Sequence, residues 1–126
     1  MKEAGELREN LAQFYGTEQW FRHFLGKMLY TEGVQFFAEN AGNGAYWFLD
    51  IVATEILPLN VEEEFIHIKL EVATADCRIS GVAAYIKADD GNDNVLFTRP
   101  LEYTDCPEGE WSFYLESGVL LLPSEH

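Results

Sequence analysis

The segment 45–57, AYWFLDIVATEIL, constrains the fold more than any other, because apolar side chains would cover almost its whole circumference in a helix. Its polar positions are Asp50, Thr54 and Glu55. A helix that is apolar nearly all round is buried on several sides. The segment is too short to span a bilayer, which takes about 20 apolar residues. We therefore predict a central core helix that ends at Pro58, which has no backbone N–H to donate.

A second helix is predicted just before this one. Thr31 is a residue type that caps helix N-termini, and Glu32 lies in the first turn after it. Apolar residues then recur at helical spacing on one side, namely Val34, Phe37, Ala38 and Ala41. The short connection 41–44 would join the two helices into a helical hairpin.

The N-terminal part begins with an amphipathic pattern over residues 3–14, which predicts a helix that Gly16 ends. The next segment, 17–31, has two interpretations. It is either a helical turn capped by Thr17 or a β-hairpin that turns at residues 25–26. Aromatic and β-prone residues on both sides of the glycine favour the hairpin.

The C-terminal half has the pattern of a sheet. Strict alternation in 65–72, FIHIKLEV, predicts a strand with one buried and one solvent-exposed face. Further strands are predicted at 80–87, 95–101, 111–116 and 119–122. Pro100 favours an edge position for its strand, or an end of the strand there. The acidic segment 89–94 is interpreted as a hairpin connection, since its spacing does not match a calcium-binding loop.

These elements predict an α+β fold in which N-terminal helices, including the helical hairpin, pack on a four- to five-stranded antiparallel meander sheet. A single domain over residues 1–126 is expected from the length. The final strand, 119–122, is apolar on both faces, so we expect the helices to cover one face or a second subunit to cover the other. The first ten residues lack the apolar region of a signal peptide, which favours a cytoplasmic protein.

Charge limits the classes of partner. The net charge is −14, and the region from residue 62 onward holds 14 acidic and 4 basic residues, against 8 and 4 in the first 61. Such a chain repels phosphate backbones and anionic lipids, so direct nucleic-acid binding and membrane attachment are not expected. A basic protein partner is compatible with this charge.

Motifs for known chemistry are missing from the sequence. It contains no P-loop, dinucleotide fingerprint, HExxH or GxSxG. Cys77 and Cys106 are 29 residues apart and lack CxxC spacing. We therefore expect no metal, no cofactor and no legible catalytic residues.

One small constellation remains as a candidate ligand-binding site. It consists of Arg22, His23, Tyr46 and Asp50. A His and an Asp within hydrogen-bonding reach would resemble an acid/base pair, although no nucleophile is evident to complete it. In the structural alternative, Arg22 and His23 satisfy carboxylates at the junction of sheet and helices. Asp50 and Thr54, four residues apart, would then form a narrow solvent-facing stripe.

The segments TEQWFRH, LYTEGVQFFAENAG, AYWFLD, DDGNDNVLFT, EYTD and GVLLLPSEH together resemble a family of small acidic bacterial proteins of unknown function. Members of that family are often encoded on plasmids and mobile elements. The resemblance covers nearly the whole chain and implies an identity without an activity.

The leading functional hypothesis is a non-enzymatic protein-interaction module, acting as a homodimer through the C-terminal sheet or with a basic partner. A first alternative is a DNA mimic that blocks a nucleic-acid-binding protein, motivated by the charge of −14. A second alternative is a small-ligand binder or enzyme with a pocket near His23 and Asp50.

Overall fold

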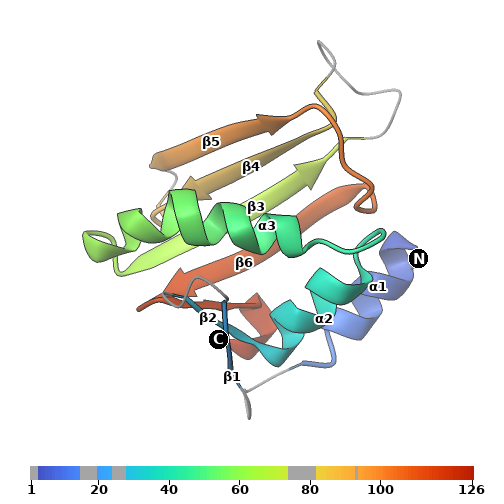
Figure 1. Cartoon of the computed structure of the whole chain (residues 1–126), viewed down its shortest axis with the longest axis horizontal. Coiled ribbons are helices and arrows are strands. Elements are labelled where there is room, and N and C mark those ends of the chain that lie inside the picture. The colour runs from blue at the N-terminus through green and yellow to red at the C-terminus, as the bar shows by residue number, and fades with distance from the viewer. Residues whose placement is uncertain (1–2, 15–19, 24–27, 74–81, 93) are drawn as a thin grey trace.

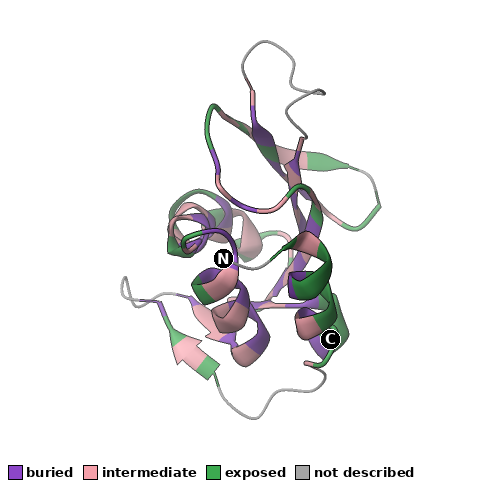
Figure 2. Ribbon diagram, turned by 90° about the vertical axis from the view of Figure 1, so that its right-hand side faces the viewer, coloured by how far each residue is buried: buried purple, intermediate pink, exposed green. Residues whose placement is uncertain are grey.

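The computed structural model describes residues 3–14, 20–23, 28–73, 82–92 and 94–126. Two helices, α2 and α3, lie across one face of a twisted sheet, and the buried residues face each other between these two layers (Figures 1 and 2). The predicted α+β class is therefore confirmed.

The helical elements run in order along the first half of the chain and return once at its end. They are α1 (Ala4–Leu11), α2 (Glu32–Asn40), α3 (Tyr46–Ile51), a π-helical turn (Val52–Ile56), a 3-10 helix (Leu57–Val61) and a C-terminal 3-10 turn (Pro123–Glu125). Helix α1 lies beside α2 (Figure 1), and its Arg8 side chain stacks 4.7 Å from the ring centre of Trp111.

The strands form one mixed sheet. They are β1 (Trp20–Arg22), β2 (Leu29–Thr31), β3 (Phe65–Val72), β4 (Ala84–Asp89), β5 (Val95–Leu101), β6 (Gly109–Glu116) and β7 (Val119–Leu121). The spatial order is β1-β2-β7-β6-β3-β4-β5 among the described residues. Neighbours are antiparallel except β2 and β7, which are parallel.

The predicted four- to five-stranded antiparallel meander is wrong in two respects. Strand β6 returns to pair with β3 instead of β5, so β6-β3-β4-β5 has the order of a Greek key. The N-terminal hairpin also joins the sheet through the parallel pair β2 and β7. Both pairings depend on contacts distant in sequence, and the alternation within a strand carries no information about its neighbours.

Several local predictions are confirmed. Strands β3 and β5 have the predicted bounds, 65–72 and 95–101, and β5 is an edge strand that contains Pro100. The antiparallel pairing of β1 with β2 confirms the hairpin interpretation of residues 17–31, although its predicted turn at 25–26 lies outside the described residues. Residues 80–81 of the predicted second strand also lie outside them.

One face of the final strand is covered within the chain, and cover of the other face by a second subunit stays a prediction. Strand β7 has a neighbour on each side in the sheet, and Leu120 is fully buried. Val119 and Leu121 are partly exposed on the other face.

Aromatic packing fixes the helical hairpin on the sheet. The Phe113 ring of β6 lies 5.0 Å from the Phe37 ring of α2 and 4.9 Å from the Phe48 ring of α3, centre to centre. All three side chains are fully buried. One strand residue thus holds both helices, at spacings where aromatic pairs are favourable.

The core helix differs from its prediction. Regular α-helix ends at Ile51, and the N–H of Leu57 donates to the carbonyl of Val52, five residues earlier. In an α-helix the nitrogen of residue 58 would donate to the carbonyl of residue 54, but Pro58 has no N–H. The chain widens into a π-helical turn and then continues past Pro58 as a 3-10 helix to Val61. The helix therefore does not end at Pro58.

The predicted burial of this helix on several sides is also only partly correct. Phe48, Leu49, Val52 and Ile56 are fully buried. Tyr46 is 42% exposed, and Leu57 is partly exposed. An apolar side of the helix therefore faces outward.

The C-terminal turn caps α2. The predicted cap at Thr31 is confirmed, because its Oγ1 accepts from the N–H of Val34 at 3.4 Å. The Glu125 carboxylate in turn accepts from the Thr31 hydroxyl at 2.5 Å and from the Gly33 N–H at 3.3 Å. Glu125 is only 8% exposed, so this carboxylate is buried with its donors at the positive end of a helix.

This cap leaves no room for a side chain at Gly33, where a Cβ would lie 2.5 Å from Leu122 Cδ1 and 2.7 Å from Glu125 Oε1. We expect Gly33→Ala to lower the free energy of unfolding by about 1–3 kcal/mol, although alanine favours helices. Gly5→Ala in α1 is the matched control, because nothing lies within 4 Å of its Cβ position. It should raise stability by about 0.5–1 kcal/mol. Urea unfolding measures the stability of both variants. An equal change in the two would contradict the close packing of Leu122 and Glu125 against Gly33.

Candidate functional site

His23 and Asp50 form a direct contact between the N-terminal hairpin and α3. The His23 N–H donates to the Met28 carbonyl at 2.8 Å, which fixes the residue at the end of β1. Its Nε2 lies 2.7 Å from Asp50 Oδ1. The His23 side chain is 3% exposed, whereas that of Asp50 is 49% exposed. The structure thus brings together two predicted site residues that are 27 positions apart.

This arrangement gives the two residues different roles. The buried imidazole has one nitrogen on Asp50 and almost no surface for a substrate. Asp50, in contrast, presents much of its carboxylate to solvent while His23 holds it in place. The pair therefore connects the hairpin to α3 and orients an exposed acid.

Tyr46 and Asp50 are one helical turn apart on α3, so they share a side of the helix. The Tyr46 hydroxyl lies 3.4 Å from Glu39 Oε1 of α2. Burial raises the pKa of Tyr46 and of Tyr30 on β2, and the Glu39 carboxylate raises both pKa values further. Tyr30, Glu39, Tyr46 and Asp50 thus lie together, and we call them the acidic aromatic surface.

Arg22 directly precedes His23 and is the last residue of β1. Successive side chains of extended backbone point to opposite faces, and Arg22 is exposed where His23 is buried. Glu39 was missed in the sequence analysis. It lies on the other helix of the hairpin, and its contact with Tyr46 depends on how the connection 41–44 folds.

A groove opens where the π-helical turn and the 3-10 helix meet the turn between β6 and β7. We call it the α3 groove. It has a volume of about 760 Å³, and its lining includes Ala53, Thr54, Leu57, Pro58, Val61 and Gly118. Because the widening of the helix before Pro58 shapes this wall, no sequence pattern indicated the groove in advance.

Two polar side chains of the α3 groove, those of Asn60 and Thr54, are bonded within the protein. Asn60 Nδ2 donates to the carbonyl of Glu63 at 2.7 Å, and Asn60 Oδ1 accepts from the Gly118 N–H at 2.8 Å. The Thr54 hydroxyl donates to the Asp50 carbonyl at 2.8 Å. The groove is therefore mainly apolar, and Thr54 connects it to the acidic aromatic surface.

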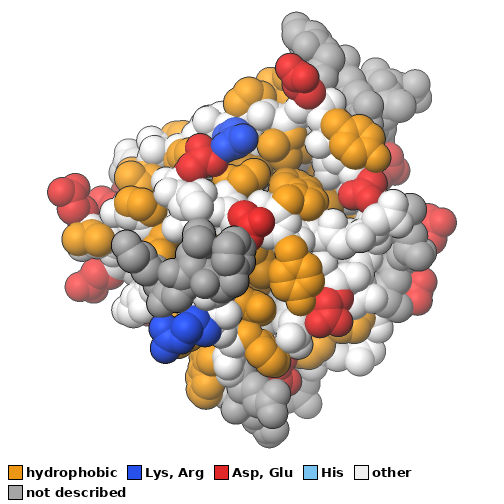
Figure 3. Space-filling model, viewed as in Figure 1, with side chains coloured by type: hydrophobic (Ala, Val, Ile, Leu, Met, Phe, Trp, Pro, Cys, Tyr) orange, Lys and Arg blue, Asp and Glu red, His pale blue; other side chains and the backbone are white. Residues whose placement is uncertain are grey.

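Charge on this side of the molecule is mostly negative. Figure 3 shows hydrophobic side chains across the helices with Asp and Glu around them, while Lys and Arg are sparse. Three bases contact acids, namely Arg99 with Glu55 of the π-helical turn, Lys69 with Glu110 and Lys87 with Glu71. In each pair the acid neutralises the charge of the base locally, while the net charge of the chain stays −14.

Nucleophiles and metal ligands do not gather at this site in the described part of the chain. Cys106 is 5% exposed, and burial raises the pKa of its thiol to about 11, so the thiol is protonated at neutral pH. No group of three His, Cys, Asp or Glu side chains among the described residues is placed to hold a metal ion. The described segments also include no helix with the length and apolar character needed to cross a membrane.

Comparison with known families matches residues 5–126 to a family of unknown function (DUF6876). The match covers nearly the whole chain and confirms the resemblance to a family of unknown function. Searches of curated proteins and of solved structures found no match.

The buried imidazole predicts a large cost for removing His23. His23→Ala leaves Asp50 without its partner and opens a cavity, so we expect a loss of about 1–3 kcal/mol of stability. His126→Ala is the control, since His126 Nε2 also contacts a carboxylate, that of Glu116 at 2.9 Å, but both side chains are nearly half exposed. Its effect should stay within about 0.5 kcal/mol. Chemical denaturation compares the two, and similar losses would contradict a structural role for His23.

Stability should fall in alkaline solution. Cys106 has a folded-state pKa of about 11, above the value near 8.5 of an unfolded cysteine. Between these values the folded state binds more protons than the unfolded state, so stability decreases as pH rises. The raised pKa values of Tyr30 and Tyr46 act in the same direction. Urea midpoints at about pH 8.5 and pH 10 test this, with a smaller fall expected for Cys106→Ala. Equal slopes in both proteins would contradict the assignment to Cys106.

Proposed function

This chain belongs to the DUF6876 family of unknown function, and we propose that it is a non-enzymatic protein-interaction module that binds a positively charged segment of a partner protein. The observation that carries the proposal is the acidic aromatic surface. There the Glu39 carboxylate raises the pKa values of Tyr30 and Tyr46, and Asp50 lies one turn after Tyr46 on α3.

The chemistry of this surface suits lysine and arginine side chains. A cation can contact the Glu39 carboxylate and at the same time the face of a tyrosine ring, which combines a charge-assisted hydrogen bond with a cation–π contact. The exposed part of Asp50 offers a second carboxylate, which the buried His23 ring holds in place. Two acids and two aromatic rings on three elements therefore form a binding surface with a defined geometry, which differs from negative charge spread over the whole molecule.

Long-range attraction supports the same class of partner. A protein with a net charge of −14 speeds the encounter with a basic partner, and this attraction weakens as salt increases. The resemblance to proteins of bacterial mobile elements is compatible with such a partner but does not identify it.

The two alternatives receive less support. A DNA mimic needs rows of carboxylates at phosphate spacing, whereas the acids in Figure 3 are separated by hydrophobic side chains. An enzyme that used His23 and Asp50 would need the imidazole to reach its substrate, and that side chain is 3% exposed.

A lysine–serine peptide is a suitable probe, because it carries positive charge without apolar side chains. We expect the peptide to bind, and its affinity to fall as salt increases. The double variant Glu39→Gln, Asp50→Asn should lower the affinity about 5- to 20-fold, because it removes two charge-assisted contacts. The amides keep hydrogen-bonding capacity toward Tyr46 and His23. Isothermal titration calorimetry provides the dissociation constants.

The control variant removes the same charge elsewhere, with Glu9→Gln and Glu102→Gln at two exposed positions. Equal weakening by both double variants would reduce the effect to net charge and overturn the proposed surface. Light scattering on the same samples tests the homodimer expected from the sequence, because a mass of 14.4 kDa is that of one chain.

A further inference from the structure

We infer that the α3 groove takes the apolar side chains of the same partner segment, so that the partner presents an amphipathic, positively charged helix. This inference rests on the proposed function for the charge of the partner. It adds a second binding site with a different chemistry, contributed by residues that the sequence analysis did not select.

The walls of the groove favour an apolar occupant. Val61 is 85% exposed although it is aliphatic, and it lies in the groove with Leu57 and Pro58. The side-chain amide of Asn60 is engaged with the backbone at Glu63 and Gly118, and the Thr54 hydroxyl with the backbone at Asp50. These side chains have their main hydrogen bonds already, so an occupant gains chiefly by covering apolar surface.

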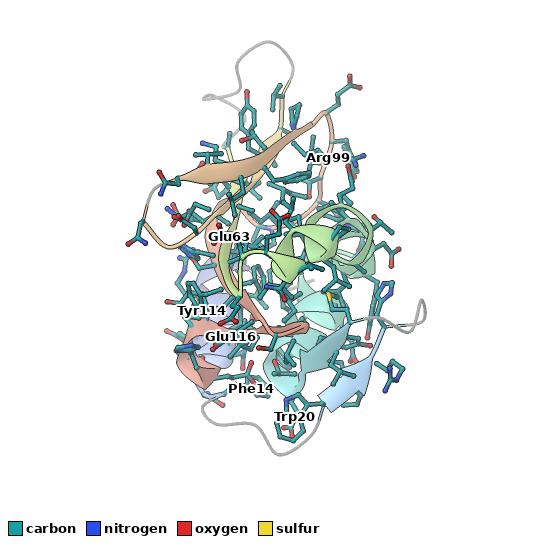
Figure 4. The ribbon with its side chains drawn as sticks, turned by 90° about the vertical axis from the view of Figure 1, so that its left-hand side faces the viewer. Phe14, Trp20, Glu63, Arg99, Tyr114 and Glu116 are labelled. Carbon is teal, nitrogen blue, oxygen red and sulfur yellow. The ribbon has the colours of Figure 1, made fainter. Side chains whose placement is uncertain are left out.

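The rim of the groove selects the charge of the occupant. Glu62, Glu63 and Glu64 follow Val61 directly, and Asn60 Nδ2 donates to the carbonyls of Glu63 at 2.7 Å and Glu64 at 3.2 Å. The Ser117 N–H on the opposite wall donates to the Glu64 carbonyl at 3.4 Å, so this acidic segment borders the groove. Figure 4 looks at this end of the molecule, and Glu63 lies on it. An apolar groove with an acidic rim favours a cationic amphiphile over an anionic one such as a fatty acid.

The length of the surface fits a helix. The acidic aromatic surface and the groove meet at Asp50 and Thr54, and together they extend along the chain from Tyr46 to Val61. Sixteen helical residues span about 24 Å, so a partner helix of about 15 residues lying alongside would reach both sites. Helices that bind in grooves use apolar anchors at i, i+3, i+4 and i+7, while basic residues on their flanks meet the acidic rim.

Three peptides of equal length and equal positive charge test this inference. The first has leucines on one helical face and lysines on the other, the second contains the same residues in an order without an apolar face, and the third has serines in place of the leucines. Binding of each to the full-length protein is measured by calorimetry. We expect the first peptide to bind at least about tenfold more tightly than the third, as expected when two or three leucines are buried.

Val61→Ser is the decisive variant, because a side chain that is 85% exposed contributes little to the fold. It should weaken binding of the first peptide about three- to tenfold and leave the serine peptide unchanged. Val95→Ser is the matched control, since Val95 is 66% exposed on the edge strand β5, and it should change neither.

The outcomes separate the inference from the proposed function. If the serine peptide binds but the leucine peptide binds no more tightly, the groove inference is wrong and the proposed function stands. If Val61→Ser and Val95→Ser act alike, or the scrambled peptide equals the amphipathic one, the inference is also overturned. If the serine peptide does not bind while the leucine peptide binds in a Val61-dependent way, the groove is supported and the charge-based proposal fails.

Discussion

The contact of Phe113 with Phe37 and Phe48 is the interaction on which the rest of the structure depends. It holds both helices of the hairpin to one position of β6, with ring centres 5.0 and 4.9 Å away. That packing sets the direction of α3 across the sheet and turns Tyr46 and Asp50 outward. The His23 and Asp50 contact then attaches the N-terminal hairpin to the outer side of the same helix.

Pro58 gives this helix its second distinctive feature, the wall of the α3 groove. Since residue 58 cannot donate to the carbonyl of residue 54, the helix widens before it and tightens after it. The groove wall produced by this change is mainly apolar and partly open to solvent. Single π-helical turns within helices often occur at functional sites.

Local features of the fold were predictable and distant pairings were not. Alternation located β3, the acidic turn signal before residue 95 located β5, and the cap chemistry of Thr31 located the start of α2, because each signal lies within a few residues. The parallel pairing of β2 with β7 joins residues about ninety positions apart, and no local pattern encodes it. The site follows the same rule. His23 and Asp50 were chosen from residue type, whereas Glu39 and the groove depend on the hairpin and on the π-helical turn.

The most direct test of a binding surface along α3 is a nuclear magnetic resonance titration of the isotope-labelled protein with the amphipathic lysine–leucine peptide. The account predicts that amide shifts concentrate at Glu39, Tyr46, Asp50, Val61 and Gly118, which join the acidic aromatic surface to the groove. Shifts centred instead on the opposite face of the sheet, around Lys69 and Tyr114, or spread evenly over all acidic segments, would contradict it.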